Sequence, residues 1–170
     1  GLGAEIWFNI GHTNKLETFP GEQNNVIMID AFDNVSFDSV IPKALEILKG
    51  KTISLITDSQ HLHQVEPVKK QLEDGGVFVK IGKGKGQLND GQVFGCEFYP
   101  AMEIKEEVDA NLFLGQSNFH AAGVAISTKV KTYILDPYFN EVRDVTNFAE
   151  KLEKKATLKI YKPMEAKVFG

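Results

Sequence analysis

The chain has 170 residues, of which 42% are hydrophobic and 25% are charged, a composition typical of a globular protein. Its formal net charge of −4 argues against a nucleic-acid partner, and it has no apolar run near the roughly 18 residues of a membrane span. Its single cysteine cannot form an internal disulfide, so we expect a reducing compartment and a cytoplasmic protein.

Short apolar runs along the chain have the character of β-strands. They are Glu5–Ile10, Asn25–Ala31, Thr52–Asp58, Val77–Gly82, Ala110–Gly115 and Lys131–Pro137. Several are continuous rather than alternating, which indicates strands that are covered on both faces.

Helical patterns lie between these runs and after the last one. We expect helices over Ser36–Gly50, Asp58–Gly76, His120–Thr128 and the final stretch from Asp144. In that final helix, Phe148, Leu152 and Leu158 would form the apolar side, and Pro163 would kink or break it. Strand–helix alternation predicts an α/β fold, a parallel-sheet Rossmann-like unit with helices on both faces.

Polar residues follow the predicted strands, where ligands bind in open parallel sheets. They are His12, Asp58, Gln60, His61, His63, His120 and Asp136. For His12 and His63 a capping or solvated side chain is an equal alternative. Asp58 fits a helix cap, and Asp136 fits a turn before Pro137. His61 and His120 are the better functional candidates, because the loops that carry them should face one another.

The loop Gly82–Cys96, with the sequence GKGKGQLNDGQVFGC, ends on the only cysteine. It is not a phosphate-binding P-loop, because no Ser or Thr follows a Gly-Lys pair at the required spacing. A flexible surface loop is the simpler interpretation, and a lone cysteine is commonly a buried, inert thiol. Because Cys96 follows Gly95 on the ligand side of the predicted sheet, it is also a candidate ligand for a metal or cluster.

Separate motifs together resemble the diphthamide synthesis family, which contains the 2-(3-amino-3-carboxypropyl)histidine synthase subunits of archaea and eukaryotes. They are LITDSQHLHQ (Leu55–Gln64), GQVFGC (Gly91–Cys96), LFLGQSNFHAAGVA (Leu112–Ala125) and ILDPYFNEVRDV (Ile134–Val145). They occur in the family's order, and the resemblance covers nearly the whole chain.

The resemblance implies one of three similar α/β units around a central site, each giving one cysteine to a 4Fe–4S cluster that binds S-adenosylmethionine. By radical chemistry, such an enzyme moves the 3-amino-3-carboxypropyl group of S-adenosylmethionine to a histidine of translation elongation factor 2, the first step of diphthamide biosynthesis. Cys96 matches the cluster cysteine of the second unit. The cofactor pocket would be lined by Gln60, His61, Gln92, Gly115 and His120.

The same resemblance implies an organisation of the chain. Residues 1–34 would end the first unit, residues 35–144 would be the complete second unit, and residues 145–170 would bridge toward a third. We therefore expect a fragment, inactive alone, of a protein that forms a homo- or heterodimer with a homologous subunit. One motif departs from the family: in IGHTNKL, Asn14 stands where the family has cysteine, and an amide is a poor ligand for iron.

Other interpretations stay open at this stage. Asn14 favours a non-catalytic scaffold that supports a partner subunit holding a complete cluster. An iron–sulfur enzyme similar to quinolinate synthase would share the threefold architecture, although the motifs fit it less well. A zinc site would use His61, His63, Cys96 and His120, with the first two in the loop before the helix.

Overall fold

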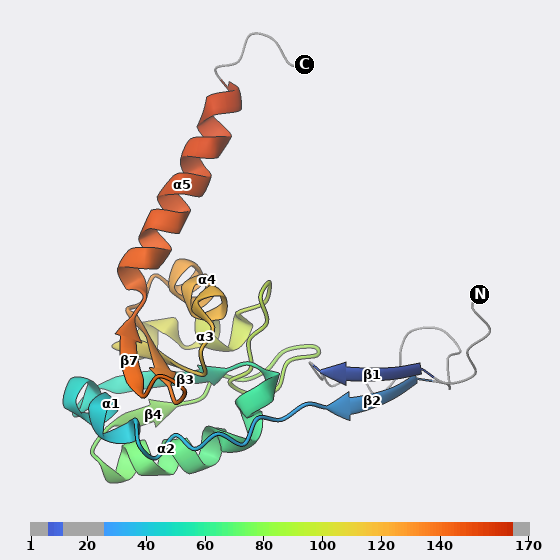
Figure 1. The fold of residues 1–170 in the computed structure, drawn as a ribbon. Coiled ribbons are helices and arrows are strands. Elements are labelled where there is room, and N and C mark those ends of the chain that lie inside the picture. The colour runs from blue at the N-terminus through green and yellow to red at the C-terminus, as the bar shows by residue number, and fades with distance from the viewer. Residues whose placement is uncertain (1–6, 12–25, 165–170) are drawn as a thin grey trace.

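The computed structural model describes residues 7–11 and 26–164 of the chain. The predictions about His12 and Asn14 lie outside these residues. β1 (Trp7–Gly11) and β2 (Val26–Asp30) pair in parallel as a two-stranded sheet, which Figure 1 shows beside the main body of the molecule. The division into residues 1–34, 35–144 and 145–170 stays a prediction, as does the place of the chain as one of three units.

The main body is built on a five-stranded sheet with the order β4-β3-β5-β6-β7. Its strands are β3 (Thr52–Thr57), β4 (Phe78–Lys80), β5 (Ala110–Leu114), β6 (Thr132–Asp136) and β7 (Glu141–Asp144). β3 pairs in parallel with both β4 and β5, and β5 pairs in parallel with β6. β7 alone runs antiparallel, against β6. The predicted α/β fold with a mostly parallel sheet is therefore confirmed.

Helices cover both faces of this sheet, as the continuous apolar strands predicted. On one face Leu55 and Leu112 pack with α1 (Ile41–Leu48) and α2 (Val65–Asp74). On the other face Ile56 and Phe113 pack with α3 (Tyr99–Glu103) and α4 (Asn118–Thr128). Figure 1 shows the two helix layers above and below the strands. Successive strand residues point to opposite faces, so both must be apolar when both faces are covered.

Two predicted helices begin later than expected, and each has a proline near its true start. α1 begins at Ile41 rather than Ser36, with a proline in its first turn, where the missing N–H costs nothing. The pattern from Asp58 divides into η1 (Ser59–Gln64), a 3-10 helix, and α2. Pro67 lacks the N–H that would donate to the carbonyl of His63, so an unbroken α-helix through this point is disfavoured.

Some elements escaped the sequence analysis altogether. They are α3, the short 3-10 helix η2 (Lys105–Glu107) and the strand β7. β7 returns from β6 through a tight turn in which Asn140 has a φ of 50°, a conformation that asparagine tolerates better than most residues. Only four residues long and half-exposed, β7 carries no apolar run that would mark it as a strand.

α5 (Thr146–Met164) projects away from the sheet, as Figure 1 shows. The predicted cap is present, because the Thr146 N–H donates to Asp144 Oδ1 at 2.9 Å. The predicted kink or break at Pro163 stays a prediction, because the described part of the helix ends at Met164, one residue later. The expected apolar side does not pack into the core: Phe148, Leu152 and Leu158 are exposed. α5 is instead held by Ala149, which packs against small residues of α4.

The packing of α5 gives a testable prediction. The Ala149 side chain is 2% exposed, so Ala149→Glu would place an unpaired carboxylate between α5 and α4 and should lower the free energy of unfolding by about 3 kcal/mol or more. Leu152→Glu adds the same charge at a position that is 40% exposed. It should change the free energy of unfolding by less than about 1 kcal/mol. Urea unfolding followed by circular dichroism measures both. Equal losses would show that α5 is not docked through Ala149.

Candidate functional site

The ends of three neighbouring parallel strands are tied together at the carboxyl edge of the sheet. The Thr57 hydroxyl, at the end of β3, donates to the carbonyl of Leu114 at 2.9 Å. The Gly115 N–H, just after β5, donates to the carbonyl of Leu135 in β6 at 3.1 Å. The segments that follow β3, β5 and β6 therefore leave the sheet side by side, where sequence analysis placed the polar residues.

His61 lies in η1, directly after β3. Asp58 caps this turn, since its Oδ1 accepts from the Gln60 N–H at 3.0 Å. The imidazole is only 2% exposed, and its Nδ1 lies 2.9 Å from Oε1 of Gln64. The ring of Phe37 packs edge-on against it at 5.4 Å. His61 is thus a fixed, largely buried imidazole rather than a solvated one.

Gly115 lies directly against the His61 ring. A methyl group at Gly115 would be 3.2 Å from Cδ2 and 3.5 Å from Nε2 of His61, and the φ of Gly115 is +126°. Both the backbone conformation and the close approach favour glycine here. Two of the predicted pocket residues are therefore in contact.

His120 lies in the first turn of α4, after β5. Ser117 caps this helix, and its Oγ accepts from the His120 N–H at 3.3 Å and lies 2.7 Å from Nδ1. The imidazole lies parallel to the ring of Phe113, with 6.0 Å between centroids, and edge-on to Phe119 at 5.5 Å. These contacts set the orientation of the imidazole. The imidazole is also partly exposed, so it stays accessible to a ligand.

The glycine-rich loop after β4 returns to the sheet before it reaches the cysteine. Gly91 and Val93 form a short parallel bridge with Thr57: the Thr57 N–H donates to Gly91 at 3.0 Å, and the Val93 N–H donates back to Thr57 at 2.8 Å. Gln92, between them, is fully buried. Its amide donates from Nε2 to the Ser59 hydroxyl at 2.9 Å.

Cys96 lies at the tip of a two-residue turn that follows this bridge. The turn is closed by backbone hydrogen bonds between Phe94 and Glu97, of which the N–H of Phe94 makes the shorter, 2.9 Å. A side chain on Gly95 would meet the Phe119 ring at 2.4 Å, so the turn rests against α4 beside His120. The Cys96 thiol is exposed. It is therefore not an inert thiol in the core.

A hollow of about 500 Å³ lies between the glycine-rich loop and the Cys96 turn. It is lined by Lys85, Gly86, Gln87, Leu88, Phe94, Cys96, Glu97 and Tyr99. The ammonium group of Lys85 lies 5.0 Å from the centre of the Tyr99 ring, so both a charge and an aromatic face border the space beside the thiol. This hollow is large enough for a small organic molecule.

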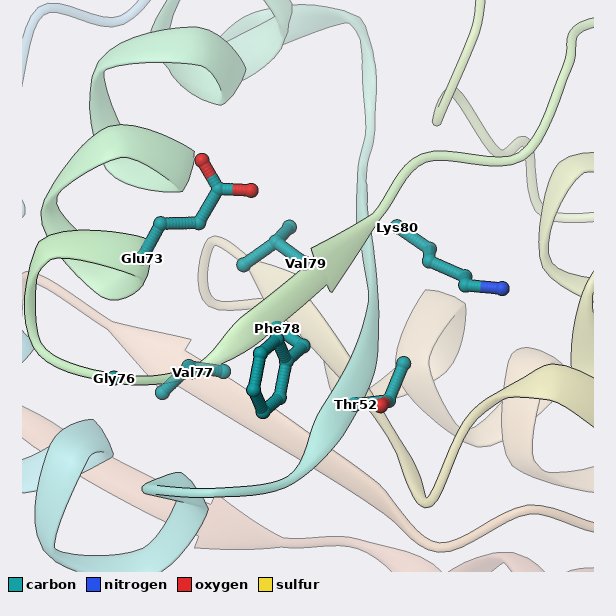
Figure 2. A pocket seen from close by; sticks show the side chains of 7 residues that line it. All are labelled: Thr52, Glu73, Gly76, Val77, Phe78, Val79 and Lys80. Atoms are coloured by element: carbon teal, nitrogen blue, oxygen red, sulfur yellow. The ribbon is translucent and has the colours of Figure 1, made fainter.

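A second hollow of about 540 Å³ lies at the free edge of the sheet, along β4, and Figure 2 shows its lining. Phe78 and Val79 point to opposite sides of the strand, and Glu73 of α2 lies on the side of Val79. Among the described residues, neither the cysteine nor a histidine borders this hollow, and Thr52 belongs to the amino end of β3. It is therefore separate from the candidate site.

The other predicted residues take more peripheral positions. Gln60 is exposed, and its carbonyl accepts from the Asp33 N–H at 3.0 Å. His63 is also exposed; its Nε2 lies 3.1 Å from Oδ1 of Asn34, and its ring packs against Phe32. The zinc alternative is contradicted, because within residues 7–11 and 26–164 no three His, Cys, Asp or Glu side chains cluster closely enough to hold a metal ion.

Tyr138 and Asp33 form a contact near His61 that sequence analysis missed. The Tyr138 hydroxyl donates to the Asp33 carboxylate, and its ring centroid lies 6.4 Å from that of His61. Burial and this carboxylate raise the pKa of the Tyr138 hydroxyl, while the hydrogen bond from Tyr138 lowers the pKa of Asp33. The tyrosine stays protonated and ties the connection after β2 to the turn after β6. The sequence feature that could have indicated this contact is the position of Tyr138 in the stretch DPYF, residues 136–139.

Asp136 ends β6 and holds the turn that carries Tyr138. Its Oδ1 accepts from the backbone N–H groups of Tyr138 at 2.9 Å and of Phe139 at 3.0 Å. Its Oδ2 pairs with the guanidinium of Arg143 at 2.8 Å, and the Asp136 side chain is fully buried. The predicted turn at Asp136 is present, and the aspartate organises it.

In open parallel α/β proteins, ligands bind outside the carboxyl ends of the strands, and this unit has a thiol, two imidazoles and a buried amide at that edge. The whole chain, residues 1–170, matches the family model of diphthamide synthesis proteins. The chain belongs to the diphthamide synthesis family, which confirms the resemblance of its motifs. The family match gives no support to an enzyme similar to quinolinate synthase.

Relatives of known structure agree with this assignment. The chain is 33% identical over 172 residues to 2-(3-amino-3-carboxypropyl)histidine synthase of Pyrococcus horikoshii, covering 99% of this chain and 48% of that protein. The crystal structure of Dph2 from Pyrococcus horikoshii with a 4Fe-4S cluster superposes with a TM-score of 0.79 and 31% identity, over 97% of this chain and 47% of that one. A second crystal structure of Dph2 from that organism superposes with a TM-score of 0.78 and 29% identity, over 97% of this chain and 47% of that one. The chain thus spans about half the length of these relatives.

The contact between Gly115 and His61 yields a prediction. Gly115→Ala should lower the free energy of unfolding by about 2–3 kcal/mol, through backbone strain and contact with the imidazole. Gly50→Ala is the matched control, because Gly50 also has a positive φ, +76°, but a methyl there meets no described atom within 4 Å. Gly50→Ala should lower the free energy of unfolding by only about 1 kcal/mol.

Denaturant unfolding measures both losses, and the NMR resonances of the His61 ring report the contact itself. Those resonances should shift in Gly115→Ala and not in Gly50→Ala. Unchanged resonances in both variants would contradict the described packing.

Proposed function

We propose that this chain is part of a 3-amino-3-carboxypropyl transferase of diphthamide biosynthesis, with Cys96 as one ligand of a 4Fe–4S cluster. The proposal rests on family membership and on the similarity to a Pyrococcus synthase. The observation that carries it is the exposed Cys96 thiol, held in a tight turn at the carboxyl edge of a parallel sheet. The related Dph2 structure holds a 4Fe-4S cluster.

The surroundings of Cys96 fit one position of such a cluster. Iron–sulfur clusters are held by cysteine thiolates, and Cys96 presents its sulfur on a turn fixed on one side by β3 and on the other by Phe119. A chain with one cysteine supplies only one such ligand, so the other thiolates would come from the rest of the protein or from a partner. When bound, the cluster would supply the electron that breaks a carbon–sulfur bond of S-adenosylmethionine.

The chain's own side chains would orient the methionine part of S-adenosylmethionine. Its amino and carboxylate groups need acceptors and donors, and His120 and Gln60 supply such groups. Ser117 and Phe113 hold the His120 imidazole in one orientation. His61, packed on Gly115, would form a rigid wall of the same site.

The acceptor and the assembly belong to the same proposal. The acceptor would be a histidine of translation elongation factor 2, and the working protein would be a homo- or heterodimer with a homologous subunit. Because the chain spans about half of its relatives, the remainder of the site would lie outside it. None of the helices in residues 26–164 has the length and apolar character that crossing a membrane requires.

A second candidate function is a non-catalytic scaffold in the same complex, and the single cysteine favours it. The scaffold would support a homologous subunit that carries a complete cluster. If the chain is a scaffold, it should co-purify with a three-cysteine homologue. Without that homologue, it should release no methionine-derived product. Product released by the intact protein alone, with reductant and S-adenosylmethionine, would exclude the scaffold.

The role of Cys96 is tested by anaerobic reconstitution of the intact protein with iron and sulfide. Cys96→Ala should lose most of the iron–sulfur absorption near 400 nm, on the order of a tenfold drop, because a thiolate ligand is removed. Met102→Ala removes another exposed sulfur, on α3, and should retain the wild-type spectrum. Equal absorption in wild type and Cys96→Ala would end the assignment of Cys96 as a ligand.

A further inference from the structure

Gln92 is a fully buried polar side chain only four residues before Cys96, at 0% exposure. Its Nε2 donates to the Ser59 hydroxyl at 2.9 Å. Its Oε1 accepts from both the backbone N–H of Asn89, at 2.9 Å, and the Asn89 side-chain amide, at 2.8 Å. Both ends of the amide are therefore engaged by protein groups. A buried amide in this state is well suited to holding segments together and poorly suited to meeting a ligand.

The groups that Gln92 joins belong to the two segments that carry the candidate site. Ser59 begins η1, the turn that contains His61. Asn89 lies in the glycine-rich loop that leads to Cys96. The Gln92 amide is thus a direct link between the His61 turn and the Cys96 loop.

The link reaches Cys96 through a short, rigid path. Val93 follows Gln92, is fully buried and is bonded to Thr57 of β3 through its N–H. Phe94 comes next and closes the turn that has Cys96 at its tip. Only Val93, Phe94 and Gly95 thus separate the buried amide from the thiol, and backbone hydrogen bonds fix the first two of them.

We propose that Gln92 is a positioning residue for Cys96: its buried amide fastens the Cys96 turn to the His61 turn and so sets the spacing between thiol and imidazole. Gln92 acts through Cys96 and does not itself touch the ligand. The functional meaning of this spacing rests on the proposed function, whereas the link itself does not. Loss of the amide would take a buried hydrogen-bond partner from both Ser59 and Asn89, and both turns would loosen together.

The first experiment needs no cluster. In the iron-free intact protein, Gln92→Leu replaces the amide with an apolar side chain of similar size and removes its hydrogen bonds with Ser59 and Asn89. Amide hydrogen exchange at Val93, Phe94 and Gln60 should accelerate about tenfold or more, because both turns open more often. Asn111→Leu is the matched control: Asn111 is also a fully buried amide of this sheet, bonded to Thr128 and Thr132, but lies toward the amino end of β5. It should leave exchange at these reporter amides unchanged.

Ser59→Ala is the milder variant, and it keeps the test decisive where Gln92→Leu does not fold. It removes the hydrogen bond from Gln92 that joins η1 to the loop and should accelerate exchange at Phe94, although Ser59 lies far from Phe94 in sequence. Because the two side chains share one bond, Gln92→Leu combined with Ser59→Ala should loosen the turns less than the sum of the single effects. Unchanged exchange at Phe94 in Ser59→Ala, or fully additive effects in the double variant, would overturn the link.

The second experiment uses the intact protein reconstituted anaerobically with iron and sulfide. Gln92→Leu should alter the electron paramagnetic resonance spectrum of the reduced cluster before S-adenosylmethionine is added, whereas Asn111→Leu should not. An unaltered spectrum, together with weaker binding of S-adenosylmethionine, would indicate that Gln92 contacts S-adenosylmethionine directly. That result would overturn the proposal. If wild type forms no cluster, the proposed function fails, and the exchange measurements still decide whether Gln92 links the two turns.

Discussion

Parallel pairing of β3 with β5 places Thr57 opposite Leu114, and every feature of the candidate site follows from that register. Parallel strands end at the same edge, so the segments after β3, β5 and β6 leave the sheet together. The glycine-rich loop returns to this edge by bonding to Thr57 as well. A shift of one residue in the pairing would turn the strand side chains to the opposite faces and displace the turns that carry His61 and Cys96 from Gly115 and His120, which follow β5.

The register is stabilised by apolar packing on both faces of the sheet. Leu55 and Leu112 pack under α1 and α2, and Ile56 and Phe113 pack under α3 and α4. Removing this apolar surface from water stabilises the parallel arrangement, which has no short hairpins to hold it locally. The site thus lies on a rigid base while Cys96 remains exposed at its rim. Rigid support beneath accessible groups is what a binding site requires.

The central strands β3, β5 and β6 could be predicted because a short, continuous apolar run between polar segments is typical of a strand buried on both faces. β7 could not be predicted, since its stability comes from pairing with β6. The position of polar residues after strands also predicted the edge where His61 and His120 lie. Burial could not be predicted, because the sequence around Gln92 is as polar as that around the exposed Gln60. What distinguishes them is tertiary: Gln92 meets Ser59, which is distant in sequence.

Gly82 and Cys96 lie at the two ends of the glycine-rich loop but face different demands. A methyl group on Gly82 would lie 1.8 Å from the backbone carbonyl oxygen of Pro100, so the fold itself restricts that position to glycine. The Cys96 thiol is exposed, and the fold would accept many residues there. Substitutions at position 82 would therefore be removed by loss of folding, whereas substitutions at position 96 would be removed only by loss of chemistry. A lineage that abandoned the reaction would keep this glycine and lose the cysteine.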